Sequence, residues 1–517
     1  MEQSVIIIGS GLGGLECGYI LARKGMKVTV LERDRNIGGC LQTFRRKGSD
    51  GRTHIFDTGF HYVGGLGEGQ SLYPLFRYFG LLDLPWKRLD TECFDEVVFT
   101  DDDRRYPFAS SYDGFAGRLA EMFPAQKDAL GKYAELLRST GDNIFRAFSP
   151  DSGMNSLFGT SAYGYLADTV ADPKLRKVLS GTSLKLELKE DTLPLYEFAQ
   201  INSSFVQSAW RLGSAADGLS GGAAIAGSLA AAIRKMGGEI HTSAEVTSIN
   251  AGDSGKVSGV NVNGETLTAD WVISDAHPAA TVGLIGECRE VRKIYRGRMR
   301  NLRNTGGMFT ANIILKSGAM PYLNRNVFVH SGDADLWNPD STSTGSVMVH
   351  FYPIQDGVEN GDAVCIDLLS PMSWDGLEGW SSSVPGRRGG EYEALKKRKL
   401  QECVELADKG LKKYYREGFS TLWDCIDAVY TSSPLTWHSY TGSPQGSAYG
   451  VAKDWNNPMG TILSPRTPLR NLLMTGQSLN LHGILGVSMT SVLTCSALLG
   501  SLDPDAALHL QEEILKK

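Results

Sequence analysis

The sequence lacks any pair of cysteines at the spacing of a metal site or a redox motif. Eight cysteines are scattered over 517 residues, without a C-x-x-C pair and without a neighbouring histidine cluster. Because metal centres and disulfide frameworks both need grouped cysteines, this pattern excludes a structural zinc and favours free thiols. We therefore expect no bound metal, no disulfide and a reducing, cytoplasmic location.

The sequence also lacks an excess of basic residues. It holds 52 Lys and Arg against 58 Asp and Glu, which is a net charge of -6. Without a basic field or a recognisable nucleic-acid motif, nucleic acid is excluded as an expected partner. The N-terminus enters an apolar strand at Val5 with no charged segment or cleavage site before it, so we do not expect a secretory signal peptide.

An unbroken hydrophobic run long enough to cross a bilayer is missing as well. Residues 471–502 contain no Lys, Arg, Asp or Glu, but Gly, Ser, Thr, Asn and His interrupt them every few residues. A spanning helix needs about twenty predominantly apolar residues. We prefer a helix buried against a cofactor, and a membrane span stays the alternative.

What is present begins with the N-terminal run SVIIIGSGLGGLECGYILARKGMKVTVLER, residues 4–33. An apolar strand, a glycine-rich turn, a helix and a second strand ending in an acid form the βαβ unit that binds a dinucleotide. Gly9 permits the turn, Gly11 lets the backbone approach the pyrophosphate, and Gly14 lets helix and strand pack closely. Glu32 is expected to accept from the ribose hydroxyls, and Gly13 and Arg33 complete this part of the predicted site.

The next residues favour FAD over NAD. Gly38, Gly39 and Thr43 follow Glu32 in ERDRNIGGCLQTF, and this extension resembles the fingerprint of FAD enzymes of the glutathione-reductase and amine-oxidase type. Glycines at these positions bring the backbone close to the far side of the pyrophosphate. The resemblance implies an α/β fold with a discontinuous Rossmann-like FAD-binding domain.

Two further segments are expected to complete that domain. Residues 239–278 alternate like a short β-meander, in which the backbone at Val246 lies near the adenine. The run LLMTGQSLNLHGILGV predicts a strand from Leu472 to Thr475, a turn at Gly476, and a helix from about Val487 that includes Gly486 in its approach. The N-terminus of such a helix can stabilise negative charge on a reduced flavin.

The glycine-rich run GLSGGAAIAG, residues 218–227, raises the alternative of a second dinucleotide site. No strand ending in an acid follows at the right distance. We prefer a helix packed closely beneath the flavin. If NAD(P)H reduces the flavin, it then has to use a transient site.

The predicted domains therefore interleave along the chain. The FAD-binding domain takes residues 1–74, 206–288 and 456–517, and a mixed α+β substrate domain takes 75–205 and 289–455. Basic residues gather at 289–303 and at 396–399 within the second substrate segment. A solvated helix face is the preferred interpretation, and peripheral contact with an anionic membrane surface is the alternative.

Three motifs outside the glycine-rich turn resemble the retinol saturase branch of the phytoene desaturase and carotenoid isomerase family. They are FDTGFHYVGG at 56–65, SPLTWHSYTGSPQGSAYG at 433–450 and LLMTGQSLNLHGILG at 472–486, and the resemblance covers nearly the whole chain. It implies a flavoenzyme that acts on a carbon-carbon double bond of a hydrophobic polyene, most directly by saturating it. Animal members carry an N-terminal membrane-targeting segment, and this chain is expected to lack one.

The first of these motifs holds Gly59, His61 and Tyr62, which we expect to line the flavin or the substrate tunnel. Saturation needs a hydride, which reduced flavin supplies, and a proton for the neighbouring carbon. The candidate proton donors are His61, Tyr62, Tyr440, Tyr449 and His482, and none of them is assigned.

Other classes of function stay open at this point. Desaturation or isomerisation of a polyene would use the same scaffold, and so would an amine oxidase, although its covalent-flavin cysteine motif is not apparent. A prenyl-lipid carrier on the same fold is the non-enzymatic alternative. A carrier need not hold FAD, whereas the glycines and the acid of an FAD fingerprint are all present.

Overall fold

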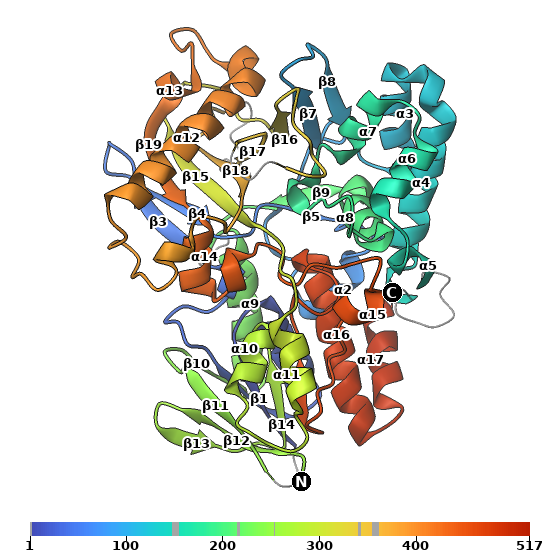
Figure 1. The fold of residues 1–517 in the computed structure, drawn as a ribbon, viewed down its shortest axis with the longest axis vertical. Coiled ribbons are helices and arrows are strands. Elements are labelled where there is room, and N and C mark those ends of the chain that lie inside the picture. The colour runs from blue at the N-terminus through green and yellow to red at the C-terminus, as the bar shows by residue number, and fades with distance from the viewer. Residues whose placement is uncertain are drawn as a thin grey trace.

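The computed structural model describes residues 3–146, 155–214, 218–252, 254–339, 343–353 and 361–516. Figure 1 shows a lower region built on a parallel sheet and an upper region built on a mixed sheet. This α/β architecture confirms the fold class predicted from the sequence.

The lower region is organised by a five-stranded parallel sheet in the order β10-β2-β1-β14-β20. Its strands are β1 (Ser4–Ile8), β2 (Lys27–Leu31), β10 (Glu239–His241), β14 (Trp271–Ser274) and β20 (Leu472–Met474). The central strand β1 is a continuous apolar run, as expected for a parallel strand covered on both faces. The beginning, middle and end of the chain thus meet in one sheet, which brings their turns to the same edge.

Helices cover one face of this sheet and a small antiparallel sheet lies over the other. The helices of the first face are α1 (Leu12–Arg23), α2 (Tyr73–Phe79), α9 (Gly222–Lys235), α16 (Gly483–Leu502) and α17 (Ala506–Leu515). The second face carries β11 (Val246–Ala251), β12 (Val257–Val262), β13 (Glu265–Leu267), α10 (Pro278–Leu284) and α11 (Lys293–Arg300). The predicted β-meander is confirmed from Val246 to Leu267 as this three-stranded sheet, whereas its expected first and last strands, β10 and β14, belong to the parallel sheet instead.

Helix α16 begins four residues earlier than predicted. The structure starts it at Gly483, with His482 as the N-cap, so Gly486 closes its first turn and Val487 opens the second. Among the described residues it is the one helix long and apolar enough to cross a membrane, and 67% of its most apolar window is buried inside the protein. Its apolar composition is thus explained by packing against α1 and α17.

The upper region is organised by a seven-stranded mixed sheet in the order β19-β15-β18-β17-β16-β7-β8. The strands are β7 (Asp95–Phe99), β8 (Arg105–Phe108), β15 (Gly307–Leu315), β16 (Asn326–His330), β17 (Ser346–Phe351), β18 (Cys365–Met372) and β19 (Ile426–Ser432). Side chains alternate between its faces with the period of a strand. Phe309 and Ala311 pack in one core cluster, while Met308 belongs to another and lines the central cavity.

Helix α12 (Gly390–Leu411) covers one face of the mixed sheet, as Figure 1 shows, with α13 (Leu422–Cys425) beside it. This helix ends at Leu411, and a short 3-10 turn, Lys412–Tyr414, follows. A helical layer flanks the sheet on the opposite side of the figure. Its helices are α3 (Tyr112–Met122), α4 (Lys127–Asp142), α5 (Asn155–Phe158), α6 (Ala162–Thr169), α7 (Pro173–Ser180) and α8 (Leu195–Gln207).

Small elements join the two regions where the site lies. They are β3 (Thr43–Lys47), β4 (Thr53–Asp57), β5 (Val63–Gly64), β6 (Trp86–Arg88), β9 (Ala209–Leu212), α14 (Pro434–Thr441) and α15 (Pro458–Thr461). Strands β5, β9 and β6 form one sheet, and the short β5 belongs to the FDTGFHYVGG motif. The motif is thus held by backbone pairing between the two regions.

The eight cysteines are all free thiols. Within the described ranges, no group of three or more His, Cys, Asp or Glu side chains is arranged to hold a metal ion.

Candidate functional site

A cavity of about 520 Å³ opens at the carboxyl ends of β1, β2, β14 and β20 and extends to the mixed sheet. This edge of a parallel sheet is where α/β folds bind their ligands. The residues of the predicted site that line it are Gly9, Gly11, Gly13, Glu32, Arg33, Gly38, Gly39, Gly59, His61, Tyr62, Val246, Gly476 and Val487. Segments far apart in the chain thus contribute to one chamber.

Gly14, Thr43 and Gly486 do not line the cavity. A Cβ on Gly14 would lie 2.1 Å from the Gly9 carbonyl oxygen, and one on Gly486 would lie 2.4 Å from the Leu481 carbonyl oxygen. Both glycines therefore allow a helix to approach the loop before it. Thr43 is the first residue of β3 and lies outside the lining residues.

The glycine-rich turn forms a backbone cradle at the start of α1. Gly9 has φ +98°, a conformation that side chains disfavour, and its N–H donates to the Leu31 carbonyl oxygen at 2.9 Å. The turn thereby ties the end of β2 to the helix N-terminus. Such a cradle presents backbone close to a phosphate and a positive dipole end toward it.

Glu32 is fixed at the cavity wall by the same turn. Its Oε2 accepts from the N–H and hydroxyl of Ser10 at 2.8 and 2.6 Å, and its Oε1 accepts from the Asp34 N–H at 2.9 Å. A carboxylate offers about four acceptor sites, so at least one is left for a hydroxyl group of a ligand. This geometry fits the ribose-binding role expected for Glu32.

Asp275, which the sequence analysis did not single out, lies directly beneath the cradle. Cβ atoms on Gly11 and Gly13 would come within 2.5 and 2.6 Å of its carboxyl oxygens. The pKa of Asp275 is raised to about 7, mainly by burial and in smaller part by the charge of Glu32, while a hydrogen bond from the Gly14 N–H opposes the rise. The available signal was its position directly after β14, because the carboxyl ends of all the parallel strands lie at this edge of the sheet.

The N-terminus of α16 faces the cavity and is held by its N-cap. The His482 Nδ1 lies 3.0 Å from Glu197 Oε1, and its Nε2 lies 3.0 Å from the Lys185 carbonyl oxygen. Both ring nitrogens are therefore engaged in fixing the helix start. The exposed N–H groups of the first turn can stabilise negative charge placed before them.

The N-terminus of α9 is already occupied by a side chain of the protein. The Asp57 carboxylate oxygen accepts from the Gly222 N–H at 2.7 Å, and a Cβ on Gly221 would lie 2.2 Å from the same carboxyl group. Since Asp57 takes the place a phosphate would need, the glycine-rich run at 218–227 is not arranged as a second dinucleotide site. It packs α9 against the 3-10 turn Gly39–Leu41, close under the cavity.

His61 and Tyr62 diverge from one another, although both line the cavity. The His61 Nε2 is buried without a hydrogen-bond partner, 3.7 Å from Asp367 Oδ2, and burial lowers the pKa of the ring to about 4. His61 is thus neutral at neutral pH. Burial raises the pKa of Asp367 to about 7, and its two oxygens accept from Asn312 and Tyr352.

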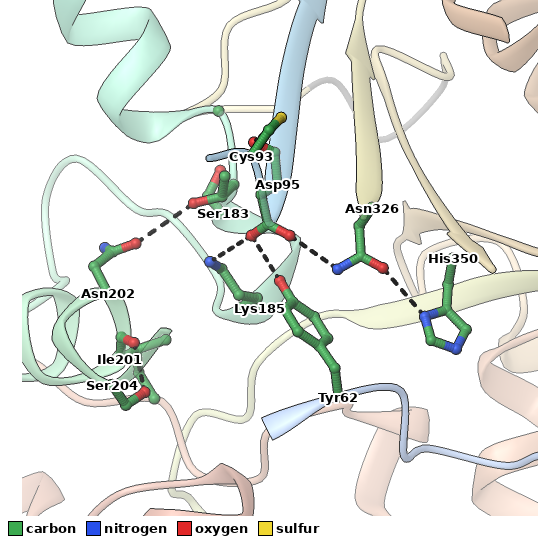
Figure 2. A network of polar contacts seen from close by, with 12 residues as sticks. Tyr62, Cys93, Asp95, Ser183, Lys185, Ile201, Asn202, Ser204, Asn326 and His350 are labelled. Atoms are coloured by element: carbon green, nitrogen blue, oxygen red, sulfur yellow. Dashed lines mark hydrogen bonds and ion pairs between the residues drawn. The ribbon is translucent and has the colours of Figure 1, made fainter. Parts of the chain in front are cut away.

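Tyr62 belongs to a polar network that Figure 2 shows, centred on the buried Asp95. Asp95 Oδ2 accepts from the Tyr62 hydroxyl at 2.9 Å and from Lys185 Nζ at 3.3 Å, while Oδ1 accepts from the Asn326 amide at 2.8 Å. His350 contacts the other end of that amide at 3.2 Å. The carboxylate is thereby surrounded by donors and paired with one cation.

Lys185 is the charged member of this network that reaches the cavity. Its Nζ lies 4.4 Å from the centre of the Phe205 ring, which lines the cavity beside it. Burial lowers the pKa of Lys185, and the charge of Asp95 opposes that shift. An ammonium has three N–H groups, so donors remain beyond the one directed at Asp95. Lys185 can hold a mobile proton at the cavity wall.

The tyrosines Tyr449 and Tyr440 are less suited to deliver a proton into the cavity. The Tyr449 hydroxyl donates to the Leu184 carbonyl oxygen at 2.6 Å, and Tyr440 is 56% exposed at the edge of the cavity. Sequence reasoning missed Lys185 because its partner Asp95 is 90 residues away in the chain. No local pattern connects the two.

Comparison with known proteins gives one family match. The family described as "Flavin containing amine oxidoreductase" matches residues 12–296, which is more than half of the chain. The matched part begins at Leu12, within the glycine-rich turn, and includes Gly13, Gly14, Glu32, Lys185 and Asp275.

Curated relatives are similar over nearly the full length. All-trans-retinol 13,14-reductase of Homo sapiens is 26% identical over 96% of this chain and 86% of its own. Prolycopene isomerase, chloroplastic, of Daucus carota is 25% identical over 95% of this chain and 79% of its own. Among solved structures, cyclohexylamine oxidase from Brevibacterium oxydans matches with a TM-score of 0.55 at 16% identity, covering 99% of this chain and 100% of that one, which shows a shared fold.

Proposed function

This chain belongs to the flavin-containing amine oxidoreductase family and is an FAD-dependent oxidoreductase, and on that premise we propose that it saturates a carbon-carbon double bond of a hydrophobic polyene. The observation that carries this proposal is the likeness, along nearly the whole chain, to all-trans-retinol 13,14-reductase. The wall of the cavity is also suited to such a substrate. It includes Leu184, Ile201, Phe205, Met308, Met348 and Leu369.

The chain offers residues that fit FAD along one side of this cavity. The cradle from Gly9 to Gly13 would hold the pyrophosphate, Glu32 the ribose, and the first turn of α16 the flavin. When bound and reduced, FAD supplies a hydride. The chain itself has to bind the polyene, exclude water and supply a proton for the second carbon.

We propose Lys185 as the source of that proton. Its Nζ combines a positive charge, a place in the cavity wall and donors not directed at Asp95. Asp95 holds the ammonium in place, and Tyr62 and Asn326 in turn hold Asp95. The five candidates named from the sequence are neutral, exposed or engaged. His61 is neutral and Tyr440 is exposed. The Tyr62 hydroxyl donates to Asp95, the Tyr449 hydroxyl donates to a backbone oxygen, and His482 is engaged with Glu197.

NAD(P)H is the proposed electron donor, binding transiently at the open side of the cavity. Because Asp57 occupies the N-terminus of α9, a resident second dinucleotide has no helix end to use there. The measurement is the rate of flavin bleaching by NADPH and by NADH without oxygen. A flavin that neither nucleotide reduces would point to a protein or quinone donor.

The deciding experiment mixes the photoreduced, oxygen-free enzyme with a panel of polyenes that includes all-trans-retinol and a carotene. Return of the oxidised flavin absorption, together with a product two hydrogens heavier, is the expected result. Amines are mixed with the oxidised enzyme in parallel. Bleaching by an amine, with no response of the reduced enzyme to any polyene, would replace this proposal with amine oxidation.

A further inference from the structure

Gln200 is a polar side chain without a partner in the apolar part of the cavity wall. It lies on α8, is 0% exposed, and neither its Oε1 nor its Nε2 has a hydrogen-bond partner. Buried amides are normally hydrogen-bonded, because leaving them unpaired costs stability. An unpaired donor and an unpaired acceptor on one cavity-lining side chain indicate a ligand group that provides both.

Ser204 lies one helical turn further along α8, on the same face, and also lines the cavity. Its hydroxyl donates to the Ile201 carbonyl oxygen at 2.8 Å, so its oxygen is free to accept. Gln200 and Ser204 together form what we call the α8 polar pair. Leu184, Met308 and Leu369 line the same cavity, so the pair is set in an apolar wall.

We propose that the α8 polar pair binds the terminal hydroxyl group of the substrate, which makes the substrate a polyene alcohol rather than a pure hydrocarbon. This inference rests on the proposed function. A hydroxyl that accepts from Gln200 Nε2 and donates to Gln200 Oε1 satisfies both orphaned groups, and Ser204 Oγ offers a second acceptor for the same proton. A hydrocarbon end satisfies neither of them.

A terminal carboxylate fits this place less well. It has acceptors only, so it would leave Gln200 Oε1 unpaired. It would also add a negative charge to a cavity whose wall already holds the carboxylate of Glu32. The chemistry of the pair thus selects an alcohol over both a hydrocarbon and an acid.

The test compares the binding of two ligands that differ only in the hydroxyl group. They are all-trans-retinol and its deoxy analogue, in which CH3 replaces CH2OH, titrated into the oxidised FAD-loaded enzyme and followed by quenching of protein fluorescence. Wild-type protein should bind the alcohol at least ~10-fold more tightly than the analogue. Gln200→Met, which keeps the length of the side chain, should bring the ratio close to one, and Ser204→Ala should reduce it part of the way.

Gln401→Met is the matched control, because Gln401 lies exposed on α12 and outside the cavity. It should keep the wild-type ratio. An unchanged ratio of the two affinities in Gln200→Met would overturn the inference. If the flavin absorption spectrum also changes, the amide serves the flavin; if it does not, the amide serves the fold. Failure of wild-type protein to bind either ligand would instead refute the proposed function on which the inference rests.

Discussion

Asp275 is a carboxyl group placed where an anionic ligand is expected, directly beneath the glycine cradle. Burial keeps it protonated to a higher pH than an ordinary aspartate, with a pKa of about 7. A protonated carboxyl can lie under a phosphate without repelling it. The residue thus couples the charge of the site to pH.

Replacing Asp275 with Asn should flatten the pH dependence of the free energy of unfolding. The carboxyl titrates near 7 in the folded protein and near 3.8 when unfolded, so between these values the folded state keeps a proton that the unfolded state has lost. Stability therefore falls as pH rises through this window, by up to about 4 kcal/mol. Denaturation of flavin-free wild-type and Asp275→Asn protein at about pH 4 and about pH 8 measures it. Equal slopes in the two proteins would contradict the assignment.

Replacing Lys185 with Met should abolish proton supply and leave ligand binding intact. We expect polyene-dependent reoxidation of the reduced flavin to slow by ~100-fold or more, because general acids contribute that much. The flavin spectrum and the polyene Kd should change little. Lys132→Met, on the exposed face of α4, is the control. Unimpaired reoxidation in Lys185→Met would remove Lys185 from the mechanism.

The variant Asp95→Asn tests the role of Lys185 independently, through the pH dependence of the reaction. Asp95 raises the pKa of Lys185, so its loss should lower that pKa and move the alkaline limb of the rate profile to lower pH. A purely structural role for Asp95 would lower the rate at all pH values without moving the limb.

At the scale of elements, the site depends on how closely α1 meets the turn that precedes it. Gly14 is part of that contact and not of the cavity wall, since a Cβ there would collide with the Gly9 carbonyl oxygen. The close contact of α1 with the turn after β1 thus sets the shape of the cradle. The start of α9 is likewise held by a contact with a distant segment, because its Gly222 N–H donates to Asp57.

Gly14→Ala should weaken FAD binding and lower the melting temperature together. The added methyl has 2.1 Å to the nearest backbone atom, so α1 has to move away from the turn. We expect FAD to bind at least ~10-fold more weakly, as measured by equilibrium titration of the apoprotein. Gly131→Ala is the matched control, because a Cβ there meets nothing within 4 Å on the exposed side of α4. It should be neutral or slightly stabilising.

At the scale of the molecule, part of the basic segment 289–303 holds helices together and part of it is exposed on the surface. Arg296 donates to the backbone oxygens of Val282, Ile285 and Val291 and therefore holds α10 and α11 together. Ile294 is 86% exposed next to it, and Met459 on α15 is 85% exposed. Arg298 joins the two helices by donating to the Met459 carbonyl oxygen at 3.0 Å.

We propose that this α11–α15 surface contacts an anionic membrane and that the protein is otherwise cytoplasmic. Apolar tips among basic side chains suit such a surface. The protein should sediment with vesicles containing phosphatidylserine and not with pure phosphatidylcholine, and high salt should release it. Ile294→Asp with Met459→Asp should abolish sedimentation, while Val384→Asp, at an exposed position elsewhere, should not. Binding that the double variant retains would leave the solvated helix face as the better account.

Local sequence patterns predicted most of the strands and helices of the nucleotide-binding region. The strand-turn-helix at residues 4–33, the meander after Val246 and the strand at Leu472 all form as their periodicity indicates. Such elements are specified by neighbours in the chain, through glycine conformation and hydrophobic alternation. The predicted start of α16 was less accurate. The helix begins at Gly483 with His482 as its N-cap, and neither residue is one that sequence preferences favour at those positions.

The sequence by itself determined the α/β fold, the glycine cradle, the acid at Glu32 and the place of the FDTGFHYVGG motif at the cavity. Only the tertiary structure decided which polar side chains line the cavity. Asp95 and Asn326 come together through the pairing of β7 with β16, and Lys185 reaches Asp95 from the turn before α8. Gln200 is left without a partner in the cavity wall, which the spacing of residues on α8 does not reveal. Contacts between distant segments depend on the packing of the whole molecule, and no sequence spacing encodes them.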